Sequence, residues 1–117
     1  MSGPVRVLVL DDDERVRRVW AKMAWAMGVD LRAVASEREA RAWLEAESFD
    51  AVLCDVRLGR NETNVAFVRE LAQARSPLVA VVSGEPSAAI EALGLRVPVF
   101  GRPLALDAVL SELGLWG

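Results

Sequence analysis

VRVLVLDDDE, residues 5–14, is the stretch that decides the fold of this chain. Its apolar run has the length of a buried strand and is too short for a membrane-spanning helix. Four consecutive acids follow it, and a folded protein tolerates such a cluster where the carboxylates face water, cap a helix or share a cation. A helical pattern begins at Glu14, so capping that helix is the simplest role for at least one of the acids.

A second run of the same kind, AVLCD at residues 51–55, also ends in an acid. Strands that run parallel in one sheet bring their carboxyl ends to the same edge. We therefore expect Asp55 to lie at the same edge as the acids that follow the first run.

The rest of the chain repeats this alternation of strand and helix. Apolar runs at residues 30–35, 78–82 and 97–100 have strand length. Helical patterns lie at 14–27, after the capping box SERE at 36–39, after Thr63 or Asn64, at 88–93 and at 106–113. Five strands alternating with five helices predict a three-layer α/β sandwich with a parallel sheet, and we expect residues 1–117 to form one domain.

Composition narrows the classes of function. The net charge of −3 argues against direct nucleic-acid binding, which needs clustered Lys and Arg. The chain has no histidine, which removes the usual general base and the commonest metal ligand. The single cysteine, Cys54, cannot form an internal disulfide, and no signal-like segment or long apolar run is present. We expect a cytoplasmic protein that does not enter a membrane.

Polar residues follow four of the five expected strands. They are the acids at 11–13, Asp55, Ser83 and Arg102. Ligands of open parallel sheets bind at this edge, where the strand order reverses. Carboxylates and water suit Mg²⁺, whereas zinc and copper are poor candidates without histidine. Ser83 and Arg102 could supply the hydrogen bonds and positive charge that a phosphoryl group needs.

These strand ends resemble the receiver domain of bacterial two-component response regulators. The resemblance runs from Val5 to Leu113 and is carried by VLVLDD at 7–12, LCDVRLG at 53–59, VVSG at 81–84 and FGRP at 100–103. It implies a doubly wound, flavodoxin-like sheet with the strand order 2-1-3-4-5. It also implies a signalling protein rather than an enzyme that acts on an external substrate.

The resemblance assigns a role to each acid. Asp55 matches the phosphoacceptor, which takes a phosphoryl group from a phosphohistidine of a histidine kinase or histidine phosphotransfer protein. Asp11 and Asp12 match the Mg²⁺-binding acids, with Asp55 and the backbone carbonyl of Arg57 completing the protein ligands. The output is then read by a downstream protein partner or through a homodimer.

Three further residues match the family's phosphoryl-binding positions. Ser83 matches the hydroxyl residue that hydrogen-bonds the phosphoryl oxygens, and Gly84 matches the small residue beside it. Arg102, followed by Pro103, occupies the family's Lys-Pro position, where the peptide bond is often cis. Arginine is longer, planar and always charged, so it could grip a phosphoryl group in bidentate fashion or rest permanently on Asp55. The family's aromatic switch position holds Val99, with Phe100 beside it.

Two tryptophans are candidates for an interface. Trp25 points away from the apolar stripe of its helix, and Trp116 lies near the chain end. Trp20 and Trp43 lie on inward stripes and are expected in the core. We also expect the side chains of residues 57 and 85 to face each other across the mouth of the phosphoacceptor site.

Two alternative functions stay open. A pseudo-receiver of the same fold would bind partners without being phosphorylated, with Arg102 substituting for the activating charge. A small Mg²⁺-dependent phosphohydrolase would use Asp55 as nucleophile.

Overall fold

Five parallel strands form one sheet in the order β2-β1-β3-β4-β5, which confirms the predicted fold class and strand order. The computed structural model describes residues 3–59, 63–102 and 105–117. The strands are β1 (Arg6–Leu10), β2 (Asp30–Val34), β3 (Ala51–Cys54), β4 (Leu78–Ser83) and β5 (Val99–Gly101). The helices are α1 (Glu14–Met27), α2 (Glu37–Ala46), α3 (Val65–Leu71), α4 (Ser87–Glu91) and α5 (Leu106–Glu112).

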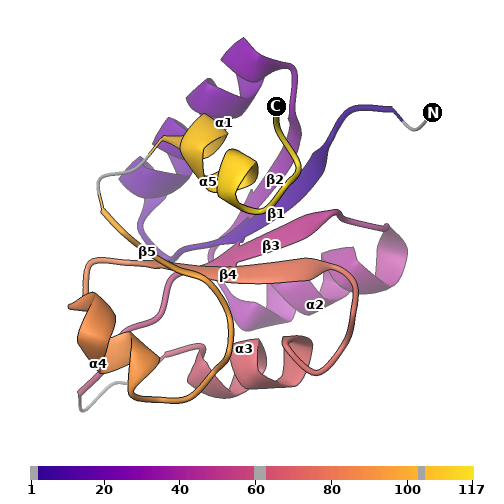
Figure 1. The fold of residues 1–117 in the computed structure, drawn as a ribbon. Helices are drawn as coiled ribbons and strands as arrows, with labels where there is room; N and C mark the ends of the chain where they lie inside the picture. The colour runs from indigo at the N-terminus through magenta and orange to yellow at the C-terminus, as the bar shows by residue number, and fades with distance from the viewer. Residues whose placement is uncertain (1–2, 60–62, 103–104) are drawn as a thin grey trace.

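Helices cover both faces of the sheet (Figure 1). Because side chains alternate along a strand, Val7 and Val9 pack into the cluster under α1 and α5, whereas Leu8 and Leu10 enter the cluster on the opposite face. Strands covered on both faces are apolar throughout, and every residue of β3 is buried. The two clusters fix the sheet and hold its strand ends in place.

Local signals set boundaries of the first two helices. Asp13 is the N-cap of α1, and its side chain accepts a hydrogen bond from the Arg15 N–H at 2.9 Å. Gly28 ends that helix in the left-handed region, at φ +74°, which glycine adopts at little cost. The capping box is also present, since the Ser36 hydroxyl accepts from the Glu39 N–H.

The second half of the chain departs from the sequence predictions in three places. Asn64, one of the two predicted starting residues, is the N-cap of α3, but its side chain makes no capping hydrogen bond. The fourth helix spans Ser87–Glu91 rather than residues 88–93. The last strand begins at Val99 rather than at residue 97, because Pro98 has no N–H to donate to the ladder. The predicted cis bond before Pro103 lies outside the described residues.

Candidate functional site

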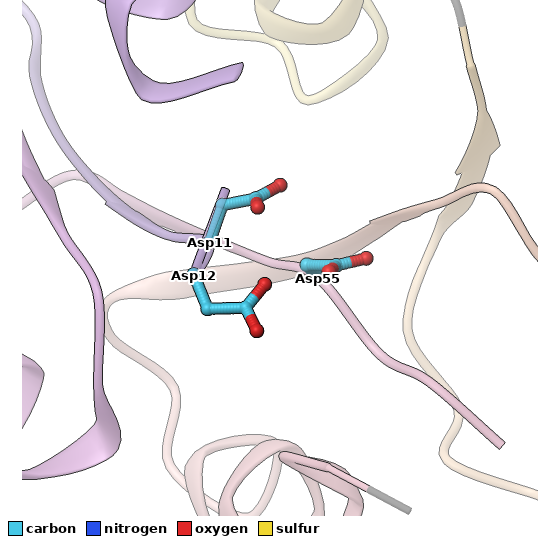
Figure 2. A group of neighbouring side chains, drawn as sticks. All are labelled: Asp11, Asp12 and Asp55. Carbon is cyan, nitrogen blue, oxygen red and sulfur yellow. The ribbon is translucent and has the colours of Figure 1, made fainter. Parts of the chain in front are cut away.

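The register between β1 and β3 places two acids side by side. Leu10 and Cys54 are Cα partners, and the Asp55 N–H donates to the Leu10 carbonyl at 2.9 Å. Asp11, Asp12 and Asp55 each offer a carboxylate oxygen, and these three oxygens lie within 4.8 Å of one another. Figure 2 shows the three carboxylates grouped beyond the ends of the two strands. The sequence prediction that these acids meet is confirmed.

Burial makes two of these acids unusual. Asp11 is 2% exposed and Asp55 is 6% exposed. Burial, which disfavours a charged carboxylate, is the main cause that raises the pKa of Asp55, and the neighbouring charge of Asp11 adds to it. Burial also raises the pKa of Asp11, against the opposing hydrogen bond from the Asp13 N–H. A cation placed beside these two carboxylates would therefore stabilise their charged forms.

Two arginines supply positive charge at the same place. Arg102 donates from Nη2 to Asp11, and the same nitrogen lies 3.3 Å from Asp55 Oδ1. Arg57 donates from Nη2 to Asp12, and its Nε lies 3.5 Å from Asp55 Oδ2. Each of the three acids thus contacts a guanidinium.

Ser83 and Glu85 stand at the end of β4. The buried Ser83 hydroxyl donates to the Val56 carbonyl at 2.6 Å and accepts from the Glu85 N–H at 3.0 Å. The Glu85 carboxylate accepts from the Leu58 N–H at 2.8 Å. These bonds join the β4 end to the loop that follows Asp55.

Most of the predicted site residues, although not Asp11 or Asp12, line an open hollow of about 320 Å³. Its lining consists of Asp55, Arg57, Ser83, Gly84, Glu85 and Arg102. Gly84 has no heavy atom within 4 Å of where a Cβ would stand, so the space beside it is open. Residues 57 and 85 line the hollow as expected, but Arg57 pairs with acids and Glu85 with a backbone N–H.

Comparison with known proteins identifies the family. The sequence model of the response regulator receiver domain matches residues 7–99. The chain belongs to this family. The matched range contains Asp11, Asp12, Asp55 and Ser83, whereas Arg102 lies beyond it.

Solved structures of receiver proteins share the fold. The chemotaxis protein CheY4 of Vibrio cholerae has a TM-score of 0.77 at 20% identity, covering 96% of this chain and 98% of its own. A CheY-like receiver protein of Methanospirillum hungatei has a TM-score of 0.77 at 20% identity, covering 96% and 92%. A Burkholderia pseudomallei response regulator, solved with a phosphorylated aspartic acid, calcium and citrate, has a TM-score of 0.77 at 22% identity, covering 93% and 66%. The comparison with curated protein sequences gives no match.

The acid cluster of this receiver domain suits a divalent metal ion. Its donors are carboxylate oxygens, which hard cations such as Mg²⁺ prefer, and their spacing allows one ion to reach all three. The Arg57 carbonyl, the expected backbone ligand, accepts a hydrogen bond from the Thr63 N–H at 3.0 Å and keeps a second lone pair. The residues present therefore fit the group that the family implies.

Sequence reasoning missed one residue at the site. Asn64 has a left-handed backbone, at φ 65°, and its Nδ2 donates to the Asp55 carbonyl at 2.8 Å. The usable signal was its residue type, because asparagine enters the left-handed region more readily than other non-glycine residues. The Asn64 side chain thus anchors the backbone of Asp55 and does not hydrogen-bond the first N–H groups of α3.

The tryptophans separate into two groups. Trp20 is 4% exposed and belongs to the core under α1 and α5, and Trp116 packs partly buried against the same core. Trp43 packs against the core on the opposite face. Trp25 is 89% exposed, as its helical position predicts. The interface roles of Trp25 and Trp116 stay predictions. Among the described residues, no helix is long and apolar enough to span a membrane.

Proposed function

We propose that residues 1–117 form a single receiver domain that accepts a phosphoryl group on Asp55 and uses Mg²⁺ to do so. The observation that carries this proposal is that Asp55 belongs both to the cluster of three carboxylates and to the lining of the hollow that it shares with Ser83 and Arg102. A structural relative with a phosphorylated aspartic acid and a calcium ion supports it, because that protein has the same fold.

The chemistry requires Asp55 to act as a nucleophile. One of its carboxylate oxygens forms a bond to phosphorus while the P–N bond of the phosphohistidine donor breaks, and the imidazole nitrogen keeps the electron pair and takes up a proton. Bound by Asp11, Asp12, Asp55 and the Arg57 carbonyl, Mg²⁺ would supply charge that stabilises the phosphoryl oxygens.

The remaining residues would position the phosphoryl group. Arg102 already reaches Asp55 and carries a planar set of donors, which suits phosphoryl oxygens. Ser83 would have to turn its hydroxyl from the Val56 carbonyl toward the phosphoryl oxygens. That rotation would transmit the change from the hollow to β4, and Gly84 leaves room beside it.

The proposal includes partners and a location. The donor is a histidine kinase or a histidine phosphotransfer protein, and the reader is a downstream protein or a second copy of this chain. We place the domain in the cytoplasm, without direct contacts to nucleic acid or membrane. Phosphorylation would shift the balance between two packings of the domain rather than turn over an external substrate.

Intact-mass measurement after incubation with Mg²⁺ and acetyl phosphate tests the proposal. We expect the mass to rise by one phosphoryl group, the gain to disappear in Asp55→Asn, and the matched surface variant Glu91→Gln to behave as wild type. Repeated turnover of the donor would instead support a phosphohydrolase.

A pseudo-receiver is the second candidate, because Arg102 and Arg57 already rest on the acids in the structure. In that case the wild-type protein would gain no mass under the same conditions and would still bind its partner. Such a result would overturn the phosphoacceptor proposal.

A further inference from the structure

Arg57 lies where its guanidinium bridges two of the three acids. Its Nη2 donates to Asp12 and its Nε lies 3.5 Å from Asp55. Arg102 bridges Asp55 to Asp11 in the same way. Three carboxylates thus share two guanidinium charges, which leaves one net negative charge when all the acids are ionised.

The two arginines differ in how easily they can leave. The Arg57 side chain is 47% exposed, and its partner Asp12 is 52% exposed. The Arg102 side chain is 30% exposed, and its partner Asp11 is 2% exposed. An exposed ion pair is weak because water competes for both groups, whereas a buried carboxylate depends strongly on its partner. Arg57 is therefore the cation that leaves more readily.

The backbone of Arg57 is anchored independently of its side chain. Its carbonyl accepts from the Thr63 N–H at 3.0 Å, and the next residue, Leu58, donates its N–H to Glu85. The guanidinium can therefore move without moving the carbonyl that is expected to bind metal.

We propose that Arg57 is a tethered counter-cation that holds Asp12 and Asp55 together without metal and leaves Asp12 when Mg²⁺ binds. This inference rests on the proposed metal site. Mg²⁺ and the Arg57 guanidinium would compete for the carboxylates of Asp12 and Asp55, so the side chain at position 57 would lower the metal affinity. Arg57 acts here through the acids and is a positioning residue.

Glu85 offers the displaced guanidinium another partner. It lines the same hollow as Arg57, and its carboxylate holds the Leu58 N–H through one oxygen. An ion pair between Arg57 and Glu85 would connect metal binding at the acids to the end of β4. The two substitutions Arg57→Gln and Glu85→Gln should therefore be coupled rather than additive in their effects on Mg²⁺ affinity.

Isothermal titration of Mg²⁺ into the unphosphorylated protein tests this inference. We expect Arg57→Gln to lower the Mg²⁺ Kd by about tenfold, at the lower end of the range over which groups around a metal site change affinity. Arg69→Gln is the matched control, because it removes the same charge from α3, where Arg69 donates to the Leu93 carbonyl, and its Kd should stay within about twofold of wild type.

The outcomes separate this inference from the proposed function. A Kd for Arg57→Gln equal to or weaker than that of wild type, with wild type still binding Mg²⁺, overturns the counter-cation role and leaves the metal site standing. Failure of every variant to bind Mg²⁺ overturns both. Circular dichroism confirms that each variant is folded, and Arg57→Lys, which keeps the charge without the planar fork, gives an intermediate Kd if the inference is right.

Discussion

Replacing Asp55 by asparagine should stabilise the metal-free protein. Asp55 is 6% exposed and lies close to two other carboxylates. At separations of up to 4.8 Å and an effective dielectric constant of about 20, each neighbouring carboxylate repels it by about 3.5 kcal/mol. Asparagine keeps the shape of the side chain and removes this charge.

Attraction to the two arginines exceeds that repulsion before the screening by water and the burial of the ion are counted. The Asp55 carboxylate lies 3.3 Å from Arg102 and 3.5 Å from Arg57. With the same dielectric constant of about 20, each of these pairs attracts by about 5 kcal/mol. Water screens the half-exposed Arg57, and burial of an ion costs several kcal/mol. The net cost of the Asp55 charge is then about 1–2 kcal/mol, in line with the direction in which its pKa is shifted.

Urea denaturation in a chelator at pH 7 measures this gain. We expect Asp55→Asn to be about 1–2 kcal/mol more stable than wild type with an unchanged m-value, and Glu91→Gln to change stability by less than about 0.5 kcal/mol. Since the folded pKa is raised, wild-type stability falls as pH rises from the unfolded pKa through the folded one. The gain should therefore shrink as the pH is lowered into that window.

With Mg²⁺ bound, we expect the wild-type protein to be more stable than Asp55→Asn. Mg²⁺ at a hundredfold excess over its Kd stabilises the wild-type protein by about 2.7 kcal/mol, and the variant, without one ligand, gains less. A variant that is less stable than wild type in chelator, or whose gain does not vary with pH, would refute the electrostatic reasoning.

Three further predictions follow from single residues. Cys54 has a pKa raised to about 12, chiefly by burial, so its thiol should resist alkylation by iodoacetamide in the native state at pH 8 and react only in denaturant. Ser83→Ala should cost about 1–3 kcal/mol in urea denaturation, because it leaves the buried Val56 carbonyl without the hydroxyl donor, and a loss below about 0.3 kcal/mol would contradict this. Trp25→Ala should leave stability within about 0.5 kcal/mol of wild type, since the ring is 89% exposed, and sedimentation at several concentrations would show whether it weakens self-association.

The sheet and its acidic edge could be predicted because they depend on short patterns. Apolar runs that end in acids specify both the buried strands and the place where Asp11 and Asp55 meet. The start of β5 was misplaced because four apolar or neutral residues resemble a strand, whereas the missing N–H of Pro98 decides where the ladder begins.

The partners of individual side chains could not be predicted in the same way. Arg57 pairs with Asp12, which lies 45 residues earlier in the chain, and the Asn64 side chain holds the Asp55 carbonyl. The sequence prediction placed Arg57 opposite Glu85, whereas its guanidinium pairs with Asp12, which follows β1. The partner of a side chain depends on distances of a few ångströms in the folded protein, and these cannot be read from residue type and sequence spacing.

The pairing of Leu10 with Cys54 has a consequence for how this site can change over evolutionary time. Neighbouring strands are about 4.8 Å apart in any sheet, so residues that directly follow paired positions inherit that separation from the main chain. Insertions in the surrounding connections, or a shorter fourth helix, leave it untouched. A slip of one residue between the strands would turn every apolar side chain of one strand toward the wrong face of the sheet. Because such a slip is strongly destabilising, the spacing of the carboxylates is maintained together with the register.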